Sequence, residues 1–500
     1  MLHVSLFIEL LRSRPRSLVL AAALTQAALW WLVPVLFYSA PPGDLALTIA
    51  VGHEFNLGSY WGPPLAAWAA EIAFDVAGMA GVYLLAQACV VVTYLAVFEL
   101  GKAIVGAQHA AIAVMLMVGI AALSVPTPTF GPPILAMPLA AYALLYFWRA
   151  VGEGQRRAWY VSAALIGLLI LTTHAGFILL AALAVFTLAN HRGRKTLLTF
   201  EPWVAAVLLV VIIFPHLLWL DISGMGTAWM ARLSAGHGGA RLVLLGRDLL
   251  LLVLSHAGML LLVVLALGWP AGRPEPVPVF QRHPLTPFER RFVLSLALSL
   301  PLAATLIGAM LGERSPVGGT SPNVLLSGLA VVVLAGTVIA VHRQWLIGFA
   351  WSLLLVAPPL IAALSVAVMP FVSAEPTATA QPARAIGRYF GETFERRTGH
   401  KLAIVTGDPR LATLVALGAR SRPSFFYDAA PRRTPWVTIE DIRTKGAIVV
   451  WPATDMAGAP PPEIKARFPG LVPELPHAFN YAIQGRLPLL RVGWGMLRPQ

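Results

Sequence analysis

Long apolar runs alternate with short polar segments through about the first 370 residues of the chain. A helix needs about 20 apolar residues to cross the roughly 30 Å hydrocarbon core of a bilayer, so runs of this length predict transmembrane helices. We therefore expect a polytopic α-helical membrane protein with about eleven spans. The predicted spans begin near residues 17, 79, 108, 131, 158, 176, 200, 248, 291, 323 and 345.

The pattern changes after residue 372, where long apolar runs end and Arg, Pro and Glu become frequent. Short stretches with helical and strand periodicity then alternate, which predicts a small α/β domain with a partly parallel sheet. The turn at Gly407-Asp408-Pro409 is interpreted as structural. The predicted helices are Ala383 to Arg397 and Leu411 to Leu417, and the predicted strands are Lys401 to Thr406, Ser424 to Tyr427 and Ala447 to Trp451.

These two patterns predict two domains. Residues 1–372 form the transmembrane domain, with a first outer loop at residues 40–78, and residues 373–500 form a soluble domain. The apolar stretch from Ser17 to Tyr38 is too long for the core of a signal peptide, so we interpret it as an uncleaved first span.

The composition supports a membrane protein, because 58% of the residues are hydrophobic and only 12% are charged. The pI of about 10.3 is explained by basic residues in short loops. With a cytoplasmic N-terminus, 15 Lys and Arg fall in cytoplasmic loops and 4 in outer loops, as the positive-inside rule requires. An odd number of spans then places the tail outside. No basic motif interleaved with aromatic residues indicates a nucleic-acid partner.

The first outer loop contains acids and aromatic residues but no Lys or Arg. Asp44 follows the end of the first span, where a carboxylate could deprotonate a hydroxyl, bind a sugar or cap the following helix. Leu45 to Leu57 is predicted to lie as an amphipathic helix on the membrane surface. Pro63 and Pro64 are predicted to begin a second helix.

This loop resembles that of the bacterial GT-C glycosyltransferases related to protein O-mannosyltransferases and to lipid A aminoarabinose transferases. The family has an acidic motif soon after its first span, followed by Gly-Tyr and Pro-Pro-Leu-x-x-Trp. The chain has Asp44, Gly58, Tyr60 and Pro63-Pro64-Leu65-Ala66-Ala67-Trp68 in those places. Thr127-Pro128-Thr129-Phe130 and Ala158-Trp159 also look like the family's middle region, and the similarity covers roughly residues 17 to 200.

The resemblance implies a GT-C-like fold with an extracytoplasmic α/β domain, in a bacterial inner membrane. It implies an inverting transfer from a polyprenyl-phosphate sugar to an envelope glycolipid, glycan or protein on the periplasmic side. Asp44 would act as the general base, and no cofactor or metal is expected. We expect substrate to be bound by residues of the same loop, namely His53, Glu54, Tyr60, Trp61 and Trp68.

The chain departs from the family at three places. Leu45 replaces the second acid of the motif, Gly62 replaces a basic residue before the prolines, and Thr172-Thr173-His174 stands where the family often has a lysine. Such lysines can meet the donor phosphate, which needs cationic or N–H partners. The candidates to replace them are Arg232, Arg241, Arg247, Arg314 and His174.

Two other functions stay open from the sequence. A transporter or flippase would need ionisable residues within the spans, and usually an internal repeat. A scaffold could bind envelope partners through the tail. Glu71 and Asp75, four residues apart on one helix, are interpreted as polar anchors of a surface helix, with a second carboxylate site as the alternative.

Overall fold

The computed structural model describes residues 2–125, 128–224, 238–267, 277–312, 322–453 and 456–499. The chain forms two compact units. The first combines Met1–Trp31 with Leu84–Leu360, and the second combines Leu32–Tyr83 with Ile361–Gln500. The whole of the predicted first outer loop, residues 40–78, therefore packs in the same unit as the tail. The predicted domain boundary at residues 372 and 373 stays a prediction, because packing does not show which residues lie in the membrane.

The first unit is helical in the residues described, apart from one short antiparallel pair of strands. The pair is β1 (Val279–Gln281) and β2 (Val338–Ala340). The helices are α1 (Leu2–Ser13), α2 (Pro15–Phe37), α4 (Leu65–Val105), α5 (Ala107–Met117), α6 (Ala121–Ser124), α7 (Pro132–Val151), α8 (Ala158–Ile170), α9 (Gly176–Ala189), α10 (His191–Thr196), α11 (Glu201–Ile222), α13 (Gly238–Ser255), α14 (Ala257–Leu267), α15 (Pro287–Leu311), η2 (Pro322–Val324), α16 (Ser327–Leu334) and α17 (Gln344–Val372). Of these, α2, α4 and α17 also contribute residues to the second unit.

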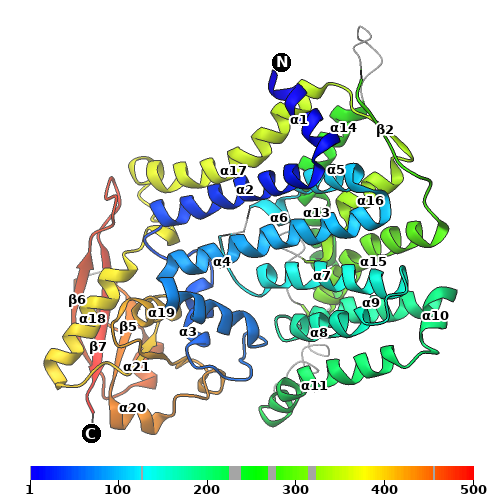
Figure 1. The fold of residues 1–500 in the computed structure, drawn as a ribbon. Coiled ribbons are helices and arrows are strands. Elements are labelled where there is room, and N and C mark those ends of the chain that lie inside the picture. Colours follow the sequence, from blue (N-terminus) through cyan, green and yellow to red (C-terminus); the bar gives the residue numbers. More distant parts are fainter. Residues whose placement is uncertain are drawn as a thin grey trace. The chain divides into compact units, whose positions relative to one another are not determined.

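Aromatic side chains join several helices of the first unit. In Figure 1, α8 lies beside both α7 and α11, and these helices are in contact. Phe147 on α7 stacks on Phe292 of α15 and meets Phe186 of α9 edge-on. Aromatic pairs in these arrangements are stabilising beyond the apolar area that they bury.

Six helices are long and apolar enough to cross a membrane among the residues described, namely α2, α4, α7, α11, α15 and α17. The pair α13 and α14, bent by 45°, could add a seventh. Every predicted span start lies near the start of an apolar helix or within one. The count of eleven stays a prediction, because α5, α8, α9 and the stretch Pro322–Leu334 have only 10–17 residues.

The second unit contains a five-stranded mixed sheet in the order β4-β3-β5-β7-β6. The strands β4, β3 and β5 are parallel, and β7 runs antiparallel to both β5 and β6. The strands are β3 (Ile404–Gly407), β4 (Ser424–Phe425), β5 (Ala447–Pro452), β6 (Val472–Phe479) and β7 (Leu490–Leu497). The helices of the unit besides those shared with the first are α3 (Leu45–Gly52), η3 (Ala378–Ala380), α18 (Ala383–Thr398), α19 (Pro409–Gly418), η4 (Pro431–Arg433), α20 (Ile439–Lys445) and α21 (Pro462–Arg467).

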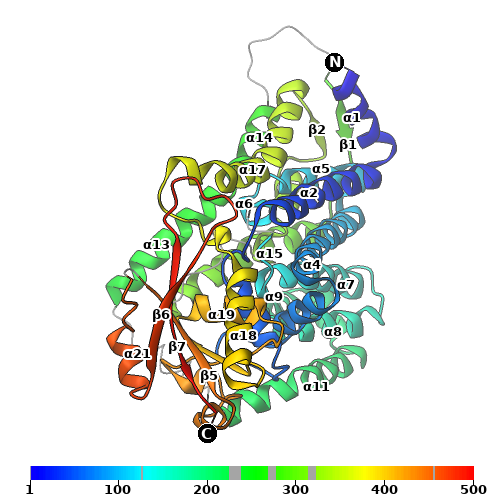
Figure 2. The ribbon, with the colours of Figure 1, turned by 90° about the vertical axis from the view of Figure 1, so that its left-hand side faces the viewer.

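The sheet of the tail confirms the predicted α/β domain with a partly parallel sheet. Five residues of β5 are buried, as expected for a strand that is covered on both faces. Figure 2 shows α18 and α19 beside each other at the sheet. Gly387 and Gly418 let these two helices approach closely, since a side chain at Gly387 would meet the backbone of Gly418 at 2.2 Å.

The first outer loop differs from its prediction in one respect. The helix expected over Leu45 to Leu57 ends at Gly52, and most of its residues are buried in the unit. The second helix starts at Leu65, directly after Pro63 and Pro64, and it is broken at Ala77 and Gly78. This break coincides with the predicted start of the second span near residue 79.

Candidate active site

Asp44 stands directly before α3, but its side chain does not cap the helix. A capping residue takes up extended backbone angles, which turn its side-chain oxygen toward the first N–H groups of the helix. Asp44 instead has φ −91° and ψ 14°, and its side chain accepts no capping hydrogen bond. The side chain is exposed, and the backbone carbonyl accepts a hydrogen bond from the amide of Thr48. The structure therefore does not support the capping interpretation and leaves the carboxylate available for chemistry.

Arg410, in the first turn of α19, holds the backbone that leads into Asp44. Its guanidinium donates to the carbonyl oxygens of Gly43 at 3.3 Å and Pro41 at 3.5 Å. It also donates to Gln381 Oε1 and to the carbonyl of Ala378, both at 2.8 Å. Burial lowers the pKa of Arg410, and the nearby charge of Asp44 opposes this shift. Arg410 thus fixes the loop and places a positive charge beside Asp44.

Glu71 of α4 is the centre of a buried cluster of ionisable groups. It is fully buried and accepts hydrogen bonds from His53 Nδ1 at 2.7 Å and from Arg422 Nη2 at 2.7 and 2.5 Å. Arg422 also lies over the ring of Phe74, at 4.4 Å. A buried carboxylate is tolerated when charged partners satisfy its oxygens. The preferred interpretation of Glu71 as a surface anchor is therefore wrong, whereas Asp75 is exposed.

The cluster also has polar atoms for which the described residues provide no partner. These atoms are Oε1 of Glu54 and Nε and Nη1 of Arg422, and all three are buried. Arg422 has a φ of +49°, a backbone conformation that is uncommon for residues with a side chain and that is often found at functional sites. Unsatisfied buried groups together with backbone strain make this cluster a candidate for ligand binding.

The pKa values of two loop residues are raised by their surroundings. The hydrogen bond to Glu71 raises the pKa of His53, and partial burial opposes this shift. Burial raises the pKa of Glu54, and a hydrogen bond with Ser424 opposes it. Both shifts favour the protonated forms, which are a cationic imidazolium at His53 and a neutral acid at Glu54.

The aromatic residues predicted to bind substrate lie near one another in the same unit. Tyr60 and Trp61 meet edge-on, and Trp61 also meets Tyr427 edge-on. The guanidinium of Arg433 lies 3.9 Å from the centre of the Tyr60 ring. Trp68 donates through its indole N–H to the carbonyl of Asn56. Tyr60 and Trp61 of the loop thus lie against Arg433 and Tyr427 of the tail, and the role of the three aromatic residues in substrate binding stays a prediction.

Comparisons with known proteins identify the fold. Residues 62–219 match the family described as Dolichyl-phosphate-mannose-protein mannosyltransferase. The structure resembles the crystal structure of ArnT from Cupriavidus metallidurans bound to undecaprenyl phosphate, with a TM-score of 0.59, 12% identity, and coverage of 97% of this chain and 99% of that chain. The chain has a GT-C fold. The GT-C fold that the resemblance predicted, with its multi-pass membrane character, is thereby confirmed.

Another solved structure also resembles this GT-C chain. It is the oligosaccharyltransferase of Archaeoglobus fulgidus in complex with Zn and sulfate, with a TM-score of 0.46, 14% identity, and coverage of 95% of this chain and 75% of that chain. No curated protein sequence matches the chain.

The residues predicted to meet the donor phosphate lie in the first unit or outside the described residues. His174 follows α8, and its Nε2 lies 3.2 Å from Nε2 of His216 on α11. Arg241 and Arg247 are on α13, and Arg247 is paired with the buried Asp248 at 2.7 Å. Arg232 and Arg314 lie outside the described residues, and the phosphate role of all five stays a prediction.

The sequence interpretation missed Arg410, Arg422 and Arg433. The tail holds 17 of the 36 Lys and Arg residues, and it was treated as a separate domain. Arg422 is 351 positions from Glu71, and no local pattern signals a contact over that distance. Within the described ranges, no group of three or more His, Cys, Asp or Glu side chains is placed to hold a metal ion.

Proposed function

We propose that this GT-C chain transfers a sugar from a polyprenyl-phosphate donor to a hydroxyl of an envelope acceptor, on the periplasmic side of the inner membrane. The acceptor oxygen attacks the anomeric carbon and the bond from that carbon to the phosphate oxygen breaks. Asp44 takes the hydroxyl proton, and the polyprenyl phosphate leaves. A single displacement inverts the anomeric configuration. The observation that carries the proposal is the exposed carboxylate of Asp44, which does not cap its helix.

Two features support Asp44 as the base. A general base must reach the proton that it removes, and an exposed carboxylate at the start of a helix can do so. Arg410 donates to the carbonyl groups of Gly43 and Pro41, so the backbone before Asp44 is restrained. The charge of Arg410 also provides a cation beside the base, and a phosphate needs such a partner. Arg410 therefore joins the predicted phosphate-binding residues.

The ligand of ArnT supports the donor class. That protein is described as bound to undecaprenyl phosphate, and this chain has a similar fold along nearly its full length. A lipid-linked donor would reach the protein through the membrane. The contacts of the donor phosphate with the residues named from the sequence stay predictions.

The cluster around Glu71 is assigned to sugar binding rather than to bond breaking. Asp44 and His53 stand at opposite ends of α3, whose eight residues span about 12 Å. A group at that distance from Asp44 cannot take part in the bond formation and cleavage at the anomeric carbon. It can bind hydroxyl groups further along the substrate, through Glu54 Oε1 and the unpaired N–H groups of Arg422. Tyr60, Trp61 and Trp68 would pack against the apolar faces of the sugar rings.

A transfer assay separates this function from transport. The purified full-length protein is placed in proteoliposomes with radiolabelled polyprenyl-phosphate sugars, extracted from metabolically labelled cells, and with an envelope fraction as acceptor. A glycosyltransferase moves label into a product that resists mild acid, because a glycosidic bond survives conditions that cleave a sugar phosphate. Label that crosses the bilayer but stays acid-labile would instead identify a transporter. Label that neither crosses nor becomes acid-stable would contradict both functions.

A further inference from the structure

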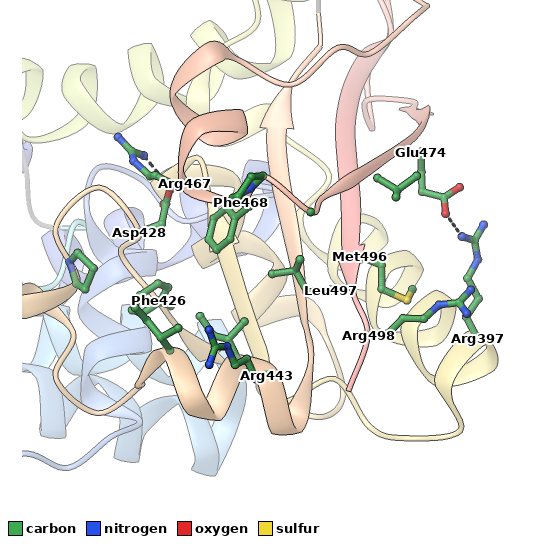
Figure 3. A pocket seen from close by; sticks show the side chains of 16 residues that line it. Arg397, Phe426, Asp428, Arg443, Arg467, Phe468, Glu474, Met496, Leu497 and Arg498 are labelled. Carbon is green, nitrogen blue, oxygen red and sulfur yellow. Dashed lines mark hydrogen bonds and ion pairs between the residues drawn. The ribbon is translucent and has the colours of Figure 1, made fainter. Parts of the chain in front are cut away.

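A cavity of about 760 Å³ lies in the tail, apart from the residues assigned above to transfer. Figure 3 shows it bordered by the segment after β4, by α20 and by the ends of β6 and β7. Small-molecule sites usually have volumes of about 300–1,000 Å³, so this cavity is large enough for an oligosaccharide of a few rings.

Four arginines line the cavity, and two of them are held in place by acids. Arg467 donates to the buried Asp428 at 2.7 Å. Arg397 pairs with Glu474 and lies over the ring of Trp494 at 5.1 Å. Because these acids balance their charges, the two arginines form part of the cavity wall but add little net charge to it.

The other two arginines, Arg443 and Arg498, have guanidinium groups available to a ligand. Arg443 has one recorded ion pair within the described residues, with Glu440 at 3.7 Å, and both side chains are about two thirds exposed or more. Exposed pairs of this kind contribute little and exchange easily. Arg498 is exposed and forms no ion pair with the described residues. With four arginines and the two acids Asp428 and Glu474, the lining carries two net positive charges.

The remaining lining is apolar and partly aromatic. Phe468 and Leu497 lie at the cavity (Figure 3), and its lining also includes Phe426 and Ile442, which are nearly fully buried. A sugar ring presents a face of C–H groups that packs against such side chains. A carboxylate or a phosphate matches the planar fork of an arginine, which can donate two parallel hydrogen bonds. A purely apolar ligand would leave the guanidinium groups unpaired, and a lone anion would leave the aromatic wall uncovered.

We propose that this cavity binds an anionic saccharide, whose phosphate or carboxylate groups contact Arg443 and Arg498 while its rings pack on Phe468 and Leu497. The inference deepens the proposed function, because an envelope acceptor bears such saccharides and the cavity would hold part of it outside the transfer site. Binding at the cavity does not require transfer, so the two ideas can fail separately.

The test measures binding to the purified full-length protein in detergent by isothermal titration calorimetry. Trigalacturonate carries carboxylates and glucose 6-phosphate carries a phosphate, with maltotriose and glucose as their neutral matches and inorganic phosphate as the anion alone. We expect at least one anionic saccharide to bind about tenfold or more tightly than its neutral match and than inorganic phosphate. Binding of trigalacturonate would identify the anionic group as a carboxylate, and binding of glucose 6-phosphate would identify it as a phosphate.

Arg443→Gln and Arg498→Gln should each weaken that binding about tenfold, because each removes a charge-assisted contact. The control is Arg384→Gln, an exposed arginine of α18 that does not line the cavity, and it should leave binding unchanged. Equal binding of neutral and anionic sugars, equal binding of inorganic phosphate alone, or no binding at all would overturn the proposal. Binding without acid-stable transfer would count against the proposed function only, and transfer without binding would count against the cavity only.

Discussion

Two helices of the second unit, α3 and α19, each begin directly after an aspartate, but only one of the two aspartates caps its helix. Asp408 has extended backbone angles, φ −59° and ψ 122°, and its side chain accepts a hydrogen bond from the amide of Leu411 at 2.9 Å. Asp44 has φ −91° and ψ 14°, and its side chain accepts no capping bond. The backbone conformation therefore decides which carboxylate caps its helix and which does not.

Glu71 extends this comparison to a third carboxylate, and its replacement should have the largest effect on stability. In Glu71→Gln the charge that faces His53 and Arg422 is lost in a buried site. Breaking a buried ion pair costs about 3–5 kcal/mol, so we expect a loss of that size in the free energy of unfolding. The matched control is Asp75→Asn, an exposed position one turn further along α4, which should change stability by less than about 0.5 kcal/mol. Denaturant unfolding of the two variants measures the difference, and similar losses in both would refute the buried cluster.

Arg410 connects α19 to the loop of Asp44, so its replacement tests whether the fold positions the base. Arg410→Lys keeps the charge but cannot donate to Gly43, Pro41, Ala378 and Gln381 together. Hydrogen bonds from charged groups contribute about 1.5–3 kcal/mol, so we expect a stability loss near the lower end of that range. The transfer rate of the folded variant should also fall, because Asp44 is no longer held. A wild-type rate in Arg410→Lys would show that the base does not depend on this arginine.

Asp408 should affect stability alone. Loss of a capping side chain costs about 0.5–2 kcal/mol, and we expect Asp408→Ala to lose about 1 kcal/mol. Transfer by the folded variant should match the wild type. Asp408→Asn is the control, because asparagine caps helices as well as aspartate does. A large loss of transfer in Asp408→Ala with normal folding would place Asp408 in the active site and remove the contrast with Asp44.

His53 should give the smallest effect, visible in the pH dependence of stability. The hydrogen bond to Glu71 raises the pKa of His53 in the folded protein. This hydrogen bond therefore stabilises the fold most at a pH below the pKa of histidine in the unfolded chain, which is about 6.5. That contribution is lost as the pH rises through the folded pKa. The midpoint of thermal unfolding of wild type and of His53→Gln should therefore differ most near pH 6 and converge at higher pH. A difference in unfolding midpoint that stays constant from pH 6 to pH 9 would show that the protonation of His53 does not contribute to stability.

The spans and the core of the tail could be predicted because their patterns are local. Apolar runs gave the helix positions of the first unit, and alternating periodicity gave α18, β3, α19, β4 and β5. The strands β6 and β7 could not be predicted in this way. Pro473 and Pro476 argue against a strand in sequence, but β6 lies at the edge of the sheet, where proline is tolerated. Gly493 lies in β7 because a side chain there would meet the indole of Trp451 at 2.2 Å.

The candidate site was predicted in part. Asp44 and the aromatic residues of the loop carry a recognisable pattern within about 25 positions. Their partners do not, because Arg410 and Arg422 reach the loop only through the folding of a tail more than 350 positions away in sequence. The sequence also could not predict that Asp408 caps its helix while Asp44 does not. That difference lies in backbone angles, which depend on how Arg410 and the turn at Gly43, with φ +53°, fix the chain before α3.

The most direct measurement of the central claim compares transfer and stability in purified Asp44→Asn. General-base catalysis contributes about 10²–10⁴-fold to a rate, so the variant should transfer sugar at least about 100-fold more slowly than the wild type. Its unfolding midpoint should equal that of the wild type, since the carboxylate makes no capping bond to lose. Transfer at the wild-type rate by Asp44→Asn would contradict the assignment of Asp44 as the base.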